Sequence, residues 1–210
     1  ESLERKYYRL ADAIITTAPY AYEYMEEKYG IDKNKVFHIP HGIDIDEFDK
    51  NMNKGEVLKG ELNETLNNYF CVTYTGALSK SEGLPTLVQS AAYLKDIKDL
   101  KILIVGSGSE KEILEDIIAK EELNNVVMID KQPRSHVPLI LKKSDILFCG
   151  LMERKVFKYG ISKNKFYDYM AAKKPIVFAS NVRDSLIDKA RAGITIKPHD
   201  PKNLANTIRF

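Results

Sequence analysis

The sequence predicts an α/β domain: a doubly wound, Rossmann-like parallel sheet with helices on both of its faces. Two observations lead to this prediction. From residue 69 onward, short apolar segments alternate without interruption with amphipathic ones. The apolar segments carry Val, Ile, Leu and Phe at successive positions, which indicates strands buried on both faces, as in a parallel sheet enclosed by helices.

The residues before 69 predict a smaller unit. A helical pattern begins at the first residue without a capping residue, and it places Leu3, Tyr7 and Leu10 on one face that needs a partner. The predicted elements that follow are a strand at 13–18, a helix from Pro19 to Gly30, a strand at 35–40 and a polar connector without strong periodicity at 51–68. Because both ends of the sequence lie inside a helical pattern, we expect a fragment of a longer chain.

The alternating region gives the order of the larger unit. Strands are predicted at 69–75, 101–106, 126–130, 145–149, 176–180 and 192–196, and helices at 84–95, 110–122, 135–142, from 164, at 185–190 and from 201. Ligands of doubly wound domains bind at the carboxyl ends of the strands. The candidate ligand loops are therefore 76–83, 106–109, 130–135 and 150–163.

The segment SKNKFYDYMAAKKP, residues 162–175, is the most informative part of the chain. The first turn of a helix has unpaired backbone N–H groups and a partial positive charge, and Lys163 and Lys165 add two full charges, so a phosphate or diphosphate fits there. Asp168 follows Asn164 by four residues and lies on the same helical face. A carboxylate beside a diphosphate suits a sugar diol, so the segment predicts a nucleotide site.

Simpler interpretations remain open for the same residues. The segment is also compatible with a capped amphipathic helix that buries Tyr167 and Met170. In the loop after the first strand of the alternating region, Gly76 allows close approach of a ligand and Lys80 can reach a phosphate, with Gly83 opening the next helix. An ordinary turn glycine with an exposed lysine explains that loop equally well.

A dinucleotide fingerprint is incomplete in this sequence. Gly106 and Gly108 follow an apolar strand as in G-x-G-x-x-G, but Lys111 occupies the position of the third glycine. Asp130 ends the next strand at slightly too long a distance for the ribose-binding acid. The pattern therefore disfavours a nicotinamide dehydrogenase.

Metal and hydrolase chemistry have weak signals. Asp44 and Asp46 form a D-x-D pair that can face one divalent cation, but a helix cap explains both acids more simply. His38 and His41 are interpreted as a strand end and a loop contact. The sequence has no nucleophile elbow of the G-x-S-x-G type. We expect no metal and no cofactor.

Composition limits the remaining classes. With 32 basic and 30 acidic residues, the charge is nearly balanced and predicts no nucleic-acid partner. Cys71 and Cys149 lie in apolar runs without the spacing of a zinc or redox motif, so reduced core thiols of a cytoplasmic protein are expected. No apolar run approaches the roughly 20 residues of a membrane span.

Six segments resemble, in order, the C-terminal half of family 4 glycosyltransferases, which have the GT-B fold: ADAIITTAPYAYEYM, VFHIPHGIDIDEF, YTGALSKSEGLPTLVQSAAYL, LKILIVGSGSE, VPLILKKSDILF and YGISKNKFYDYMAAKKPIVFAS. The similarity is greatest to the bacterial subgroup that builds capsule, colanic-acid or O-antigen sugars. It implies that residues 1–50 are the tail of the acceptor domain with the interdomain segment. Residues 51–210 would be the nucleotide-sugar donor domain, truncated at its C-terminus.

The resemblance also implies site residues. Lys80 and Lys165 would act on the diphosphate as catalytic groups. The donor would be bound by Gly76, Ala77, Gly106, Gly108, Lys131, Gln132, Arg134, Val137, Ser162, Lys163, Asn164 and Asp168. Within this set Asp168 would hold the ribose hydroxyls, and the loop 131–134 would cradle the base.

Two positions depart from the family pattern. The first of two glutamates that the family commonly shows falls at Gly160, where backbone amides would replace the side chain, and the second is the shorter Asp168. The family often has a lysine directly before the glycine that corresponds to Gly83, and here that residue is Glu82. Either Lys80 makes the phosphate contact of that lysine instead, or no residue does.

The resemblance implies transfer of a hexosyl or N-acetylhexosaminyl group from a nucleotide diphosphate sugar with retention of configuration. The donor would be UDP-linked, because UDP-sugars are frequent in the family. The acceptor would be a glycan or a lipid-linked molecule in bacterial surface polysaccharide synthesis. Partners would be the donor and the N-terminal acceptor domain of the same protein. Peripheral contact with the inner face of the plasma membrane is an expectation for the full-length protein, and the fragment alone would bind nucleotide weakly and be inactive. Alternatives are a sugar-nucleotide epimerase of the same fold and a non-catalytic nucleotide-binding or interaction domain.

Overall fold

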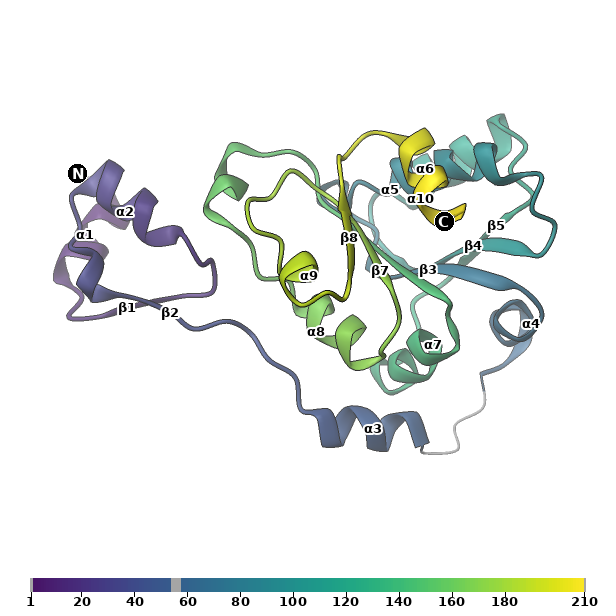
Figure 1. The fold of residues 1–210 in the computed structure, drawn as a ribbon, viewed down its shortest axis with the longest axis horizontal. Coiled ribbons are helices and arrows are strands. Elements are labelled where there is room, and N and C mark those ends of the chain that lie inside the picture. Colours follow the sequence, from purple (N-terminus) through teal and green to yellow (C-terminus); the bar gives the residue numbers. More distant parts are fainter. Residues whose placement is uncertain (1, 54–57, 210) are drawn as a thin grey trace.

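The computed structural model describes residues 2–53 and 58–209, which form a small lobe and a larger sheet domain joined by a helical segment (Figure 1). In the lobe, two parallel strands pair with Ile15 opposite Phe37. The elements of the lobe are α1 (Leu3–Leu10), β1 (Ile14–Thr16), α2 (Ala21–Tyr29), η1 (Lys33–Lys35) and β2 (Val36–His38). The segment α3 (Ile45–Asn53) leads from the lobe to the sheet domain.

The sheet domain contains a six-stranded parallel sheet, and the predicted α/β fold is confirmed. Its strands are β3 (Phe70–Ala77), β4 (Leu100–Ser107), β5 (Val126–Ile129), β6 (Ile146–Gly150), β7 (Ile176–Ala179) and β8 (Gly193–Ile196). They lie in the order β5-β4-β3-β6-β7-β8. From β3 the sheet extends through β4 to β5 on one side and through β6 and β7 to β8 on the other, so its topological switch point lies between β3 and β6. Doubly wound domains bind their ligands at the carboxyl edge beside this point.

Helices cover both faces of the sheet (Figure 1). The helices of the domain are α4 (Gly60–Asn68), α5 (Leu84–Ser90), α6 (Lys111–Lys120), α7 (Val137–Lys143), α8 (Asn164–Ala171), α9 (Leu186–Lys189) and α10 (Pro201–Arg209), with the short turns η3 (Ala91–Leu94) and η5 (Lys155–Tyr159). On β4, Ile102 and Ile104 pack in one core with α5, α6 and α10, whereas Leu103 packs with α4 and α7. Successive strand residues therefore meet opposite layers, which explains the unbroken apolar runs.

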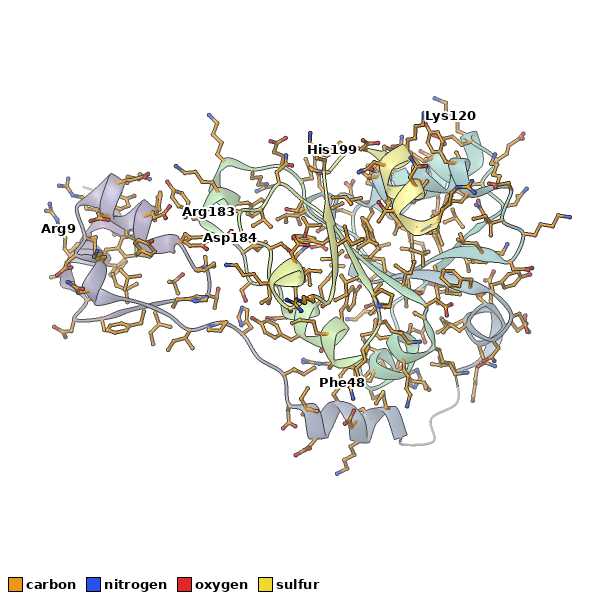
Figure 2. The ribbon with its side chains drawn as sticks, viewed as in Figure 1. Arg9, Phe48, Lys120, Arg183, Asp184 and His199 are labelled. Atoms are coloured by element: carbon orange, nitrogen blue, oxygen red, sulfur yellow. The ribbon has the colours of Figure 1, made fainter. Side chains whose placement is uncertain are left out.

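Two predictions about the first 68 residues are wrong. The connector at 51–68 contains the end of α3 and all of α4, because Leu62, Thr65 and Leu66 share a face that is buried against the sheet; residues 54–57 lie outside the described part. The opening helix does have a cap, since the Ser2 hydroxyl accepts a hydrogen bond from the Arg5 N–H at 3.3 Å. Phe48 on α3 is buried in the core of the sheet domain (Figure 2).

The small lobe meets the sheet domain through mostly polar contacts. Arg183 Nη1 donates to both carboxylate oxygens of Glu23, at 3.0 and 3.1 Å, and Arg183 lies on the side of the domain that faces the lobe (Figure 2). The Tyr20 N–H donates to the Tyr159 carbonyl at 3.0 Å. Gly160 has φ +84°, and a Cβ there would lie 2.5 Å from Pro19 Cγ. A side chain at position 160 is therefore incompatible with this contact.

No helix in the described ranges has the length and apolarity that crossing a membrane requires.

The carboxyl edge of the sheet depends on glycines. Gly76 of β3 pairs with Gly106 of β4, and a Cβ on Gly106 would lie only 1.9 Å from the Gly76 carbonyl oxygen. No neighbouring side chain can relieve this overlap, because the obstacle is backbone.

We expect Gly106→Ala to lower the free energy of unfolding by about 3 kcal/mol or more, because the added methyl group must push two central strands apart. Gly42→Ala is the matched control, since a Cβ at position 42 meets nothing within 4 Å. Urea denaturation of both variants measures the difference. Equal stability of the two would show that the strands do not approach as described.

Candidate functional site

The loops that follow β3, β4 and β6 are held together by backbone contacts at the carboxyl edge. The loop after β3 contains η2 (Lys80–Glu82). The Leu78 N–H donates to the Ser107 carbonyl, and the Met152 N–H donates to the Ser81 carbonyl, both at 2.9 Å. A Cβ on Gly150 would lie 2.1 Å from the Glu82 carbonyl oxygen. The loop after β3 is therefore fixed between its two neighbours, and this fixes where its side chains point.

Glu82 lies between the two lysines of the predicted phosphate turn. Lys163 Nζ donates to Glu82 Oε1 at 3.0 Å and Oε2 at 2.9 Å, and to the Gly150 carbonyl at 2.8 Å. Lys165 Nζ donates to Glu82 Oε2 at 2.8 Å. The side chains of Glu82 and Lys163 are each 12 % exposed and that of Lys165 is 17 % exposed. We call these three residues the lysine–glutamate cluster.

The electrostatics of this cluster keep Glu82 ionised. Burial alone would raise the pKa of the Glu82 carboxyl, but Lys165 and Lys163 outweigh burial and lower this pKa below its ordinary value. Two ammonium groups and one carboxylate leave the cluster with one net positive charge. The two full charges that the sequence predicts are therefore partly neutralised within the chain itself.

Tyr74 forms the floor beneath Lys165. Lys165 Nζ lies 4.0 Å from the centre of the Tyr74 ring, a cation–π contact. The Tyr74 hydroxyl donates to the Ala77 carbonyl at 2.6 Å. A Cβ on Gly76, which has φ +144°, would lie 3.0 Å from Lys165 Nζ. The absence of a side chain at position 76 thus leaves room for the ammonium group at the end of β3.

Helix α8 is anchored to the sheet by Tyr169. This side chain is fully buried, and its hydroxyl accepts a hydrogen bond from the Thr75 N–H at 3.1 Å. Its neighbour Phe166 packs edge-on against Phe178 of β7, with the ring centres 4.9 Å apart. These contacts hold the first turn of α8, with Lys165, beside the end of β3.

Asp168 lies one turn further along α8 and is half-buried. Burial raises the pKa of its carboxyl above the ordinary value, and the positive charges of Arg134 and Lys165 oppose that rise only in part. Arg134 belongs to η4 (Arg134–His136), at the end of the loop that follows β5. Among the described residues, no hydrogen bond or ion pair within 4 Å engages the Asp168 carboxylate. A half-buried carboxyl group thus lies where the positive charges of Arg134 and Lys165 act on it.

The remaining predicted residues of the phosphate loops lie around this centre. Lys80 is exposed on η2 and takes no part in the cluster. Asn164 is exposed at the start of α8, whereas the Ser162 hydroxyl lies 3.3 Å from the Tyr167 hydroxyl. Ser162 also lines a cavity of about 250 Å³ between α8 and the end of β2. The structure therefore separates Ser162, which faces the lobe, from Lys165, which faces the end of β3.

The predicted base loop, residues 131–134, has mostly exposed side chains. Lys131 is exposed, and the Gln132 side-chain amide donates to the Asp130 carbonyl at 3.0 Å. Val137 begins α7 and packs at the border of the core that contains Phe166. Gly108 allows the loop after β4 to approach the loop after β3, because a Cβ there would lie 2.3 Å from the Leu78 carbonyl oxygen.

Two motifs have structural explanations. Asp44 caps α3, as its carboxylate accepts a hydrogen bond from the Glu47 N–H at 2.9 Å. Asp130 forms an exposed ion pair with Lys111 at 2.6 Å, so the residue in place of the third fingerprint glycine binds the acid that follows the next strand. Within residues 2–53 and 58–209, no group of three or more His, Cys, Asp or Glu side chains is arranged to hold a metal ion.

Sequence reasoning missed part of the candidate site. The sequence presents Glu82 only as a departure from a family pattern and Gly150 only as the first residue of the candidate loop 150–163, and it does not single out Tyr74. The signals were present in part: Gly150 ends an apolar strand, and Tyr74 stands two residues before Gly76 on a strand otherwise rich in small and β-branched residues. The approach of Glu82 to both lysines depends on which strands are neighbours, and the sequence pattern does not give that order.

Comparisons with known proteins identify the family of this chain and structures that share its fold. A family described as Glycosyl transferases group 1 matches residues 70–210, and one described as Glycosyltransferase Family 4 matches residues 1–47. No curated protein matches the chain.

Solved structures with the same fold include a glycosyltransferase from Rickettsia africae, with a TM-score of 0.75 at 18 % identity, covering 100 % of this chain and 56 % of that one. Anabaena Alr3699/HepE in complex with UDP and glucose has a TM-score of 0.72 at 18 % identity, covering 96 % and 53 %. Sucrose-phosphate synthase from Thermosynechococcus elongatus has a TM-score of 0.69 at 19 % identity, covering 98 % and 50 %. The chain spans about half the length of these proteins.

We expect Asp168→Asn to stabilise the unliganded chain at pH 7. A carboxyl whose pKa is raised on folding destabilises the folded state when it is ionised. This destabilisation disappears as the pH falls below 3.8, the ordinary pKa of an aspartate. Thermal unfolding of wild type and variant should therefore differ at pH 7 and converge at acid pH. Asp116→Asn, on the exposed face of α6, is the control and should leave the melting temperature unchanged. A variant less stable than wild type at pH 7 would contradict the environment described for Asp168.

Proposed function

Because this chain belongs to the group 1 family of glycosyl transferases, we propose that it is the donor-binding part of an enzyme that transfers a sugar from a nucleotide diphosphate sugar to an acceptor hydroxyl. The observation that carries the proposal is the juxtaposition of Lys165 with the half-buried Asp168 at the carboxyl edge of the sheet. Support for a UDP-linked donor comes from solved structures of the same fold, which include HepE with UDP-glucose and TarM from S. aureus with UDP.

The diphosphate of the donor is assigned to the space beside Gly76 and the first turn of α8. Lys165 Nζ lies next to Gly76. The N–H groups of Asn164 and Lys165 come before the first hydrogen bond of α8, which the Phe166 N–H donates to the Lys163 carbonyl. When the bond between the sugar and the diphosphate breaks, its electron pair stays on the diphosphate oxygen. The lysine and the fixed amides stabilise this charge more in the transition state than in the ground state. Lys80, exposed at the same edge, is proposed as a second contact with the distal phosphate.

The nucleoside is assigned to the space between α8 and the loop after β5. In the described part of the chain no hydrogen bond engages the Asp168 carboxylate, so it can accept hydrogen bonds from the ribose hydroxyls. The positive charge of Arg134 acts on the pKa of this carboxyl. The backbone and side chains of Lys131 and Gln132, which precede Arg134, border the position of the base. The donor would therefore lie along the carboxyl edge of the sheet, with its diphosphate at the end of β3 and its base near the loop after β5.

The acceptor is assigned to the part of the enzyme beyond this chain, because the chain spans about half the length of the proteins that share its fold. We propose a glycan or lipid-linked acceptor, transfer with retention, and a role in bacterial surface polysaccharide synthesis at the inner face of the membrane. The lysines and amides supply the positive charge on which the leaving group depends, so we propose a transferase that works without a bound metal or cofactor. The isolated chain is expected to bind the nucleotide and to transfer nothing.

Calorimetric titration with UDP and with uridine tests the two central assignments. Lys165→Ala should lower the affinity for UDP by about tenfold or more, since a charged hydrogen bond to phosphate is lost. The affinity for uridine, which has no phosphate, should stay unchanged. Asp168→Ala should weaken both ligands, because both contain the ribose diol. Lys120→Ala, at the far end of α6 (Figure 2), is the charge-matched control and should bind as wild type does.

Three results would count against the proposal: equal losses on both ligands for both site variants, no binding of UDP by the wild type, or a preference of the wild type for NADH over UDP.

A further inference from the structure

Glu82 occupies the position that the proposed function gives to a negatively charged ligand. We propose that Glu82 is an internal counter-ion that the donor diphosphate has to displace from Lys165, so that this residue sets how strongly the site favours diphosphates over monophosphates and uncharged nucleosides. The inference rests on the proposed function and adds to it a specificity residue of this chain.

The contacts of the two lysines divide their roles. Lys163 Nζ has three hydrogen-bond acceptors, two from Glu82 and one from the Gly150 carbonyl. An ammonium group has three donors, so the donors of Lys163 are saturated. In the described part of the chain, Lys165 Nζ has a single acceptor, Glu82 Oε2, besides the Tyr74 ring. Lys165 therefore retains donors for a ligand, whereas Lys163 holds the loops together.

The position of the carboxylate makes it a competitor. Its oxygens lie 2.8 to 3.0 Å from the lysine nitrogens, which are the distances that phosphate oxygens would take. All three side chains of the lysine–glutamate cluster are at least four-fifths buried. Charges in such surroundings are screened less than charges on the surface, so Glu82 and a diphosphate would repel each other strongly if both remained at Lys165.

The route of displacement is a side-chain rotation. The backbone on either side of Glu82 is held by the Ser81 carbonyl, which accepts from Met152 N–H, and by the close approach of Gly150. The backbone of the loop therefore has no room to retreat. The flexible side chain of Glu82 can turn away from Lys165 and keep its contact with Lys163, which leaves Lys165 to the incoming phosphate.

A different role for Glu82 predicts the opposite sign. If the carboxylate stayed in place and oriented Lys165 toward the donor, its removal would leave that lysine less well positioned. The affinity for UDP would then fall. The effect of neutralising Glu82 on UDP affinity therefore distinguishes a displaced counter-ion from a positioning residue.

Glu82→Gln keeps the shape of the side chain and removes its charge. In calorimetric titrations of the 210-residue chain, we expect the variant to bind UDP about tenfold tighter than wild type, UMP by a smaller factor, and uridine equally well. Glu64→Gln, on the exposed face of α4, is the charge-matched control and should bind all three ligands as wild type does. Unchanged or weaker UDP binding by Glu82→Gln, at a melting temperature that shows a folded protein, would overturn the inference.

A second variant tests whether Glu82 acts through Lys165. In a Lys165→Met background, Glu82→Gln should raise UDP affinity by clearly less than tenfold, because the released ammonium group is missing. A full tenfold gain in that background would overturn the assignment to Lys165. Binding of no nucleotide by wild type or by Glu82→Gln would instead overturn the proposed function and this inference with it.

Discussion

The close approach of backbone at the carboxyl edge is the constraint on which the candidate site depends. Gly106 and Gly150 bring the loops after β4 and β6 so near to the loop after β3 that an added Cβ would overlap a carbonyl oxygen at either position. This packing fixes the backbone of the loop between them. It also explains how an acid and two lysines that are more than 80 residues apart come to share one small, largely buried volume.

Much of the fold follows from the sequence because the strands are buried on both faces. A run such as ILIV in β4 has no polar side to present to water, so it is recognisable wherever it occurs, and all six strands of the domain were placed correctly. The helix α4 was missed for the opposite reason. Its buried residues, Leu62, Thr65 and Leu66, are separated by Asn and Glu and include a threonine, so the apolar stripe is too weak to be seen without the sheet beside it.

The candidate site could be predicted only where the relevant residues lie close together in sequence. Lys165 and Asp168 belong to one helical turn, so local geometry is enough to place them on the same edge. Glu82 pairs with that turn because β3 lies next to β6, and no local pattern reports the neighbours of a strand. Tyr74 was hidden for a related reason, since a tyrosine on a buried strand looks like core until a cation is found above its ring.

The polar contact between the small lobe and the sheet domain has a mechanical consequence. The ion pair of Arg183 with Glu23 is an example, because more than half of the arginine side chain is exposed to water. Such a pair contributes little free energy and weakens as ionic strength rises. The interior of the sheet domain is apolar and insensitive to salt. Reorientation of the lobe is therefore expected to cost less free energy than deformation of the sheet.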